Sequence, residues 1–462
     1  MKKIIAVLLM IGMMFLLCSC SVMDAVMGEI KEGIKEGLEE ELTEEATEKP
    51  KGFEPMETDD FYDIDNTYYK VSPYYTPIVC TVSYDCLEND EQKQLYRRLV
   101  ESVYTVSDCT DDTGMFRCQQ VVREGNILSE AQVRTVVKAI YDDHPEQFWV
   151  TIYFDYMADE EENYYAVMLY SCYSPKDIGP WLEKIREAEE SFIDSVADGL
   201  SEYEREKLVH DYIIDTCYYN EAESNVLEAY HSIYGVLVKG KAVCEGYAKA
   251  FQMLLNLVGI ECVGIEGEGV EPDEEPNFDD NILHMWNAVK IDGEWYFADV
   301  TWDDSEEAVL RHYYLNAPDE MFHNSHIPSQ LTSQMEDEDI TPKGTYWQVS
   351  MNIFVPECTA TEYCYVIREC AHLDSYTDTE DLTDAMLKAA ENGEENFIIY
   401  VDPAFSSLDD ALDHLIYDYP QYIFSYLSTV NNRLSDSSID TEHISFGYDE
   451  DFSTIILEFE YR

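Results

Sequence analysis

Hydrophobic residues alternate with polar residues in several short runs, and between these runs they recur at helical spacing. In the first third of the folded sequence, alternation predicts strands and helical spacing predicts helices, one of which begins at Ser129 and ends before Pro145. The predicted strands cover 76–85, 148–157 and 164–173, and the predicted helices cover 91–104 and 129–144. Pro175 and Pro180 predict a boundary, after which residues 181–219 form two helices leading into the central region.

The last part of the chain repeats this order of elements. A strand is predicted over 347–356 and a final strand over 453–462, with a helix between them that begins at residue 407 and ends before residue 420. Ser407 and Asp410 mark the start of that helix and Pro420 its end. The stretches "IYDDHPEQF" and "IYDYPQYIF" suggest that two related α+β modules flank the centre, although chance similarity between small α+β units explains them equally well.

The central region contains one helix that begins with a cysteine. Downstream of Cys244, the residues Tyr247, Phe251, Leu254 and Val258 form one apolar helical face, which ends at Gly259. Unpaired N–H groups at a helix start favour a thiolate over a thiol. A helix-terminal cysteine alone is still more often a core thiol, so a nucleophile also requires a base.

A β-hairpin supplies the candidate base. Asp292-Gly293 predicts a two-residue turn, and counting back from it pairs Ile291 with Glu294, Val289 with Tyr296, Asn287 with Ala298, Trp286 with Asp299 and His284 with Thr301. Side chains alternate along strands, so His284 and Asp299 share one face as diagonal neighbours. A carboxylate that orients an imidazole next to a thiol is the arrangement of nucleophilic catalysis, whereas the alternative is a solvated hairpin with incidental polar residues.

The stretches around the cysteine and the hairpin resemble a known protein family. The stretches "YGVLVKGKAVCEGYAKAFQMLLNLVGIECVGIEG", "HMWNAVKIDGEWYFADVTWDD" and "YYLNAPDEMFHNSH" resemble the bacterial transglutaminase-like domain, in the superfamily of papain-type cysteine proteases. The resemblance spans about Leu208 to His326 and implies that Cys244 is the nucleophile, His284 the general base and acid, and Asp299 the orienting carboxylate. Val243 and Glu245 flank the cysteine where animal transglutaminases have Gln and Trp, so protein crosslinking is not implied.

Other candidate residues are less specific. Trp286 and Trp302 are candidates for an acyl channel or for core packing, and His210 and His312 are interpreted as structural or surface residues. The acidic stretch "EGVEPDEEPNFDDN", from Glu268 to Asn281, contains no EF-hand pattern. We therefore expect no metal and no cofactor, with calcium as the alternative that animal relatives raise.

The N-terminus predicts export. Lys2 and Lys3 precede an apolar run over 4–17, and the following "LCSC" resembles the lipobox of bacterial lipoproteins, which implies cleavage before Cys20 and a lipid on its thiol. An ordinary secretory signal is the alternative. The next residues are rich in Glu and nearly free of aromatics, so they predict an extended tether. Eleven cysteines remain in a compartment where disulfides form, and their odd number predicts one free thiol.

Composition narrows the partners. The chain has 96 Asp and Glu against 29 Lys and Arg, a net charge of −67, which repels phosphate backbones and excludes nucleic acid as a partner.

The full prediction is an α+β protein with a transglutaminase-like core of the papain-like type between two small α+β modules. Its segments are a signal peptide at 1–19, an acidic linker at 20–74, an N-terminal module at 75–179, a catalytic domain at 180–344 and a C-terminal module at 345–462. The predicted activity is thioester-mediated acyl transfer, by hydrolysis or amine transfer, on amide bonds of proteins or peptides at the cell surface. The chain is expected to be lipid-anchored on the extracellular face of the cell membrane. The alternative function is a non-catalytic binding module on the same fold.

Overall fold

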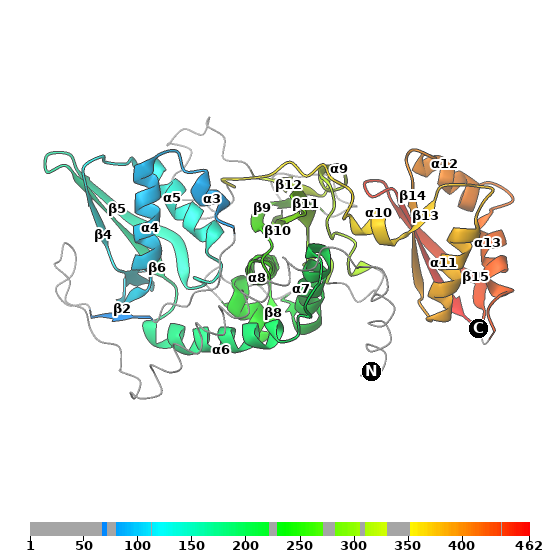
Figure 1. Cartoon of the computed structure of the whole chain (residues 1–462), viewed down its shortest axis with the longest axis horizontal. Coiled ribbons are helices and arrows are strands. Elements are labelled where there is room, and N and C mark those ends of the chain that lie inside the picture. Colours follow the sequence, from blue (N-terminus) through cyan, green and yellow to red (C-terminus); the bar gives the residue numbers. More distant parts are fainter. Residues whose placement is uncertain are drawn as a thin grey trace.

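The computed structural model describes a chain of three successive units (Figure 1), and the predicted α+β class is confirmed. The description covers residues 67–71, 80–111, 113–220, 229–270, 282–304, 310–329, 352–435 and 437–462. The predicted signal peptide, Cys20 and most of the predicted tether lie outside these residues. Among the residues described, no helix combines the length and the apolar character needed to cross a membrane.

The N-terminal unit is an antiparallel sheet covered by helices. Its strands run in the order β1-β2-β3-β6-β4, and β5 pairs with β6. They are β1 Tyr68–Lys70, β2 Thr105–Thr110, β3 Phe116–Cys118, β4 Val121–Glu124, β5 Val150–Asp159 and β6 Tyr164–Ser171. The helices are α3 Val82–Asp85, α4 Asp90–Ser102 and α5 Glu130–Asp143. The predicted start of α5 at Ser129 is confirmed by a capping box with Gln132.

Two expectations for this unit differ from the structure. The strand predicted over 76–85 is wrong for Val82–Asp85, which form α3, because the backbone N–H groups of Ser83 and Tyr84 donate to the Asp143 carboxylate at 3.1 and 2.8 Å. In addition, β1 lies inside the predicted linker of residues 20–74 and pairs with β2, so the sheet begins before residue 75.

Two helices connect this unit to the centre, as predicted. They are α6 Pro175–Ile193 and α7 Glu202–Thr216, the second opened by a capping box of Ser201 and Glu204. The predicted boundary at Pro180 falls within α6, since the helix continues past this residue. Pro175 occupies the first helical turn, where the missing N–H of proline costs nothing, so it begins the helix.

The central unit packs one helix, α8 Cys244–Leu257, against an antiparallel sheet of order β11-β10-β9-β12. The strands are β9 Cys262–Gly269, β10 Ile282–Ile291, β11 Glu294–Ala298 and β12 His326–Pro328. Short elements complete the unit: β7 Tyr218–Tyr219 paired with β8 Lys241–Ala242, η2 Ala229–His231, η3 Gly235–Lys239 and α9 Asp319–Phe322.

The hairpin between β10 and β11 has the predicted register. Ile291 pairs with Glu294, Val289 with Tyr296 and Asn287 with Ala298. Asp292 and Gly293 have φ values of 49° and 91°, the positive values that a type I′ turn requires. The ladder ends at Ala298, so the predicted pairings of Asp299 and Thr301 lie beyond it.

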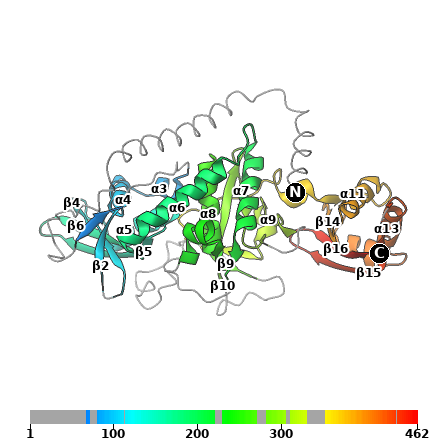
Figure 2. The same cartoon turned by 90° about the horizontal axis from the view of Figure 1, so that it is seen from below.

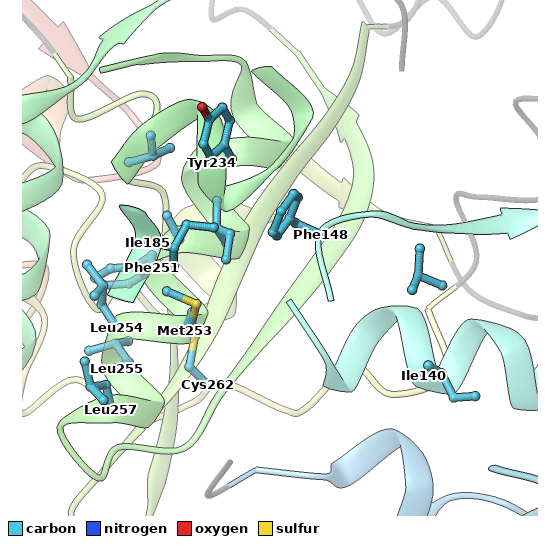
Figure 3. Packing of buried hydrophobic residues seen from close by; sticks show 14 of the residues in the cluster. Ile140, Phe148, Ile185, Tyr234, Phe251, Met253, Leu254, Leu255, Leu257 and Cys262 are labelled. Carbon is cyan, nitrogen blue, oxygen red and sulfur yellow. The ribbon is translucent and has the colours of Figure 1, made fainter. Parts of the chain in front are cut away.

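One apolar core joins the N-terminal and central units. Phe251 and Leu254 of α8 are fully buried in the same cluster as Ile140 of α5 and Phe148 (Figure 3). The Phe148 ring stacks on Tyr234 with 6.1 Å between centroids. Each such side chain contributes about 1.5–3 kcal/mol by leaving water, so the apolar face predicted for α8 fixes the helix against the unit before it.

The C-terminal unit is a four-stranded sheet of order β13-β14-β16-β15, with α11 and α13 on one face (Figure 2). Its elements are α10 Tyr365–Glu369, β13 Ala371–Leu373, α11 Glu380–Glu391, β14 Asn396–Val401, α12 Leu408–Leu412, η5 Asp413–Tyr417, α13 Ile423–Asn431, β15 Ile439–Asp449 and β16 Thr454–Tyr461. The predicted helix start at Ser407 and the final strand are confirmed.

The strand predicted over 347–356 is wrong for residues 353–356, which adopt no regular structure. The chain after Asn352 instead lies along the central unit, where Tyr365 N donates to Leu315 O at 3.0 Å and Asp319 N donates to Cys358 O at 2.7 Å. Backbone groups of this segment therefore form hydrogen bonds with the central unit rather than with a neighbouring strand.

Candidate active site

Cys244 is the first residue of α8, and its side chain is only partly buried. The residue before it, Val243, has extended backbone angles and supplies no side-chain cap, so no side chain competes for the N–H groups of the first turn. Burial raises the pKa of nine other thiols, which are those of Cys80, Cys86, Cys118, Cys172, Cys217, Cys262, Cys358, Cys364 and Cys370. Ten of the cysteines from Cys80 to Cys370, Cys244 among them, are free thiols, so the expectation of one free thiol is wrong.

Gly246 lets another segment approach the start of α8 closely. A Cβ atom at this position would lie 2.5 Å from the backbone oxygen of Tyr230 and 2.8 Å from the Ala242 side chain. Only glycine fits there, so the loop that contains η2 rests directly on the helix turn that begins with Cys244.

The structure brings Cys244, His284 and Asp299 together. His284 Nε2 lies 2.5 Å from Asp299 Oδ2, although Asp299 is one residue past the end of β11. The Asp299 backbone holds this position through its N–H, which donates to Tyr314 O at 3.3 Å. His284 also forms a side-chain hydrogen bond with Cys244, and because Nε2 faces Asp299, Nδ1 is the nitrogen left for the thiol.

Charge controls the protonation of this histidine. Burial by itself lowers the pKa of His284, but Asp299, together with the hydrogen bond to Cys244, raises it to about 10. Burial likewise acts to raise the pKa of Asp299, yet the two histidines that donate to it hold the pKa well below its usual range. The structure therefore favours an imidazolium at His284 beside a carboxylate at Asp299.

His326 is a second imidazole on the same carboxylate, and the sequence interpretation assigned it no role. Its Nε2 lies 2.9 Å from Asp299 Oδ2, and its Nδ1 lies 2.8 Å from Ser325 Oγ. Oδ1 of Asp299 accepts from the backbone N–H groups of Thr301 and Trp302 at 2.8 and 3.0 Å. Asp299 is fully buried with four donors, which fixes the carboxylate in one orientation.

Tyr219 is a further residue near the thiol that sequence reasoning missed. It lies on β7, opposite Ala242 of β8, two residues before Cys244. Burial, followed by the charges of Cys244 and Asp299, raises the pKa of its hydroxyl to about 12. Tyr219 therefore keeps its proton at neutral pH and remains a hydrogen-bond donor, while 43% of the residue is open to solvent.

Glu245, directly after the cysteine, anchors α8 to the N-terminal unit. Its carboxylate accepts from Lys249 Nζ at 2.8 Å and from the Tyr141 hydroxyl of α5, and lies 2.9 Å from His231 Nδ1. Burial would raise its pKa, but Lys249 and His231 lower it to about 2. The Lys249 ammonium also lies 3.5 Å from the centroid of the Tyr141 ring, a cation–π contact.

The two tryptophans have different surroundings. Trp286 is 1% exposed and packs on Phe297, so it matches the core alternative rather than a channel. Trp302 is half-buried, with its ring 5.5 Å from His284 and 4.4 Å from His326. Only Trp302 flanks the histidines at a position that keeps some solvent exposure.

The calcium alternative falls on residues 268–281, of which 271–281 lie outside the described residues. In the described part of the chain, two groups of side chains have ligand atoms close enough for a metal ion: His284, Asp299 and His326, and His210, Asp211 and His312.

Comparison with known proteins agrees with this architecture. The family description of the transglutaminase-like superfamily matches residues 191–300. Kyphoscoliosis peptidases of Mus musculus and Homo sapiens are each 33% identical over 69 residues, which is 14% of this chain and only 10% of theirs.

Two crystal structures show weaker likeness. One is of a candidate cysteine protease from Cytophaga hutchinsonii, with 14% identity and a TM-score of 0.21 over 32% of this chain and 61% of that one. The other is of a TGase, with 13% identity and a TM-score of 0.22 over 55% of this chain and 63% of that one. At these TM-scores the assignment rests on the family match. Residues 191–300, with Cys244, His284 and Asp299 among them, therefore match the transglutaminase-like superfamily.

Proposed function

We propose that this chain is a cysteine enzyme that transfers acyl groups from amide bonds of proteins or peptides through a thioester on Cys244. The observation that supports it most is the hydrogen-bonded series Cys244, His284 and Asp299, with the thiol partly exposed at a helix start. A structural cysteine needs neither an imidazolium beside it nor a fully buried carboxylate behind that imidazolium.

The proposed reaction has two steps. The Cys244 thiolate attacks the amide carbonyl carbon, and His284 Nδ1 gives its proton to the nitrogen as the C–N bond breaks, which releases an amine and leaves a thioester. Water or a second amine then attacks the thioester carbon, His284 accepts a proton from the attacking group, and the C–S bond breaks to regenerate the thiolate. Asp299 holds the imidazole in place throughout.

Tyr219 completes the proposed site. Each tetrahedral intermediate carries a negative oxygen, and the Cys244 backbone N–H at the start of α8 is one donor available to it. The Tyr219 hydroxyl, which feels the charge at Cys244 and retains its proton, is the second.

Hydrolysis is the favoured outcome. Water is always present as an acceptor, and the relatives over 69 residues are named peptidases. The lipobox-like "LCSC" supports attachment by a lipid at Cys20 to the extracellular face of the cell membrane, so that the substrate is a cell-surface protein or peptide. Metabolic labelling with a radioactive fatty acid tests the anchor, because Cys20→Ser abolishes incorporation if it is correct.

One incubation tests the reaction itself. The purified protein is mixed with a glutamine-containing protein and an isotope-labelled primary amine, and mass spectrometry detects incorporated amine, deamidated glutamine and cleaved peptide. Cys244→Ala should abolish every product, whereas Cys86→Ala, which removes an exposed thiol, should abolish none. The absence of any product from the unmodified chain would contradict the proposal and favour a binding module on the same fold.

A further inference from the structure

Two histidine–carboxylate groups have the spacing of metal ligands, but their hydrogen bonding differs. In the first, His284 and His326 both direct Nε2 at Asp299, so their imidazoles are already satisfied by the carboxylate. In the second, made of His210, Asp211 and His312, one ring nitrogen has no hydrogen-bond partner. The second group therefore has an unused ligand atom.

That atom is Nδ1 of His210. The His210 side chain is fully buried on α7, and Nδ1 lies 3.8 Å from Asp211 Oδ1, too far for a hydrogen bond. His312 Nε2 lies 2.5 Å from the same Asp211 oxygen, and the ligand atoms of all three residues are within 4.8 Å of one another. Two imidazoles and a carboxylate thus converge from α7 and from the turn after Leu310.

The opposite nitrogen of His210 is held as it is in metal-binding histidines. Nε2 lies 2.9 Å from Oδ2 of Asp303, which is fully buried, so Nε2 donates to this carboxylate and Nδ1 is the nitrogen that can bind a metal ion in exchange for a proton. Asp303 is fixed in turn, because its Oδ1 accepts from Tyr314 N at 2.8 Å. A carboxylate that orients an imidazole by its second nitrogen is the usual support of a zinc ligand.

We propose that His210 Nδ1, Asp211 Oδ1 and His312 Nε2 bind a zinc ion. Zinc accepts imidazole nitrogen and carboxylate oxygen at about 2.0–2.2 Å in tetrahedral geometry, which separates the ligand atoms by about 3.3 Å. Reaching it requires the Asp211–His312 pair to separate slightly and His210 to move closer to Asp211. The Asp211 side chain is 40% exposed, so water can occupy the fourth position.

Zinc at this position would connect α7 to the segment that supports the proposed active site. Asp303, which orients His210, donates its backbone N–H to the Asp299 backbone oxygen at 3.1 Å. The site lies outside the Cys244, His284 and Asp299 series, so zinc there has a structural effect on the Asp299 turn and takes no part in acyl transfer.

Zinc titration of the purified full chain tests the site. Cys244→Ser is used as the background, because a thiol beside His284 could bind zinc by itself. We expect one equivalent of zinc by isothermal titration calorimetry and a higher Tm when zinc is present. Cobalt in place of zinc should give visible bands without thiolate-to-metal charge transfer.

His312→Gln in that background should weaken binding at least tenfold and remove the increase in Tm. His323→Gln changes an exposed histidine outside the proposed ligand set and should leave both unchanged. Asp211→Asn, which alters a partly exposed carboxylate, is the second ligand variant in case His312→Gln does not fold. Binding that is equally strong in both ligand variants, a thiolate spectrum with cobalt, or no saturable binding would overturn the proposal.

Discussion

Removing the charge of Asp299 should change the protonation of His284 more than any other single substitution. The pKa of His284 is about 10, against an ordinary value of about 6.5. One pKa unit corresponds to about 1.4 kcal/mol, so this difference favours the imidazolium by roughly 5 kcal/mol. Asp299→Asn keeps the shape but loses the charge, so only Cys244 then opposes the effect of burial and the pKa of His284 falls toward its ordinary value.

NMR titration of histidine Cε1 resonances measures this directly, with His284→Gln to assign the signal. We expect the midpoint to fall by at least three units in Asp299→Asn, and the acyl-transfer rate to fall at least 100-fold, as expected when a triad carboxylate is lost. Asp304→Asn, which alters a neighbouring carboxylate that bonds Tyr247 instead, should leave the midpoint in place. A His284 midpoint that stays near 10 in Asp299→Asn would refute the argument.

The same pKa has a consequence for stability. A histidine with a raised folded-state pKa stabilises the fold fully below its unfolded value of about 6.5, and this contribution is lost as the pH rises through about 10. Thermal unfolding of the unmodified chain should show this loss between those two values, and Asp299→Asn should lack it.

Three further substitutions test single features. Tyr219→Phe should lower kcat about 10- to 100-fold with little change in KM, measured by steady-state kinetics, because one donor to the oxyanion is lost; an unchanged kcat would remove Tyr219 from the mechanism. Burial raises the pKa of Glu206 to about 8, so its charged form is costly at alkaline pH, and Glu206→Gln should raise Tm at pH 9 relative to the unmodified chain while changing it little at pH 6; a lower Tm at pH 9 would contradict this. Gly246→Ala places a Cβ 2.5 Å from Tyr230 O and should lower the free energy of unfolding by about 1–3 kcal/mol, measured by urea denaturation. An unchanged value would show that the loop containing η2 moves away from the added Cβ without cost.

Sequence patterns predicted the elements whose interactions are local. The β10–β11 register follows from one turn dipeptide and alternation, and the start of α5 follows from a cap within the same turn. The segment Val82–Asp85 was predicted as a strand because its apolar residues alternate, but Asp143, about 60 residues away in sequence, binds its backbone and forms α3 instead. Alternation over a few residues cannot reveal such a partner.

The residues of the candidate site likewise divide into those placed by local sequence patterns and those placed by contacts distant in sequence. Cys244, His284 and Asp299 could be proposed from sequence because a helix start and one hairpin place them, and hairpin counting brings two of them to one face. His326 reaches Asp299 from β12, and Tyr219 on β7 lies opposite Ala242, two residues before the thiol, through strand pairings that no local pattern specifies. The sequence signalled His326 only by its place at the end of a stretch that carries the resemblance, and Tyr219 lies outside those stretches.

The contacts of Glu245 give the N-terminal unit a role at the thiol. A hydrogen bond to a charged group contributes about 1.5–3 kcal/mol, and the Glu245 carboxylate accepts one from Lys249 on its own helix and one from Tyr141 on α5. A chain that began at residue 180 would keep Lys249 but lose Tyr141, together with the apolar contact between Phe148 and Tyr234. The first turn of α8, and hence the position of Cys244 relative to His284, would then depend on a carboxylate with fewer donors. The N-terminal unit therefore supplies contacts to the first turn of α8 that residues 191–300 do not supply by themselves.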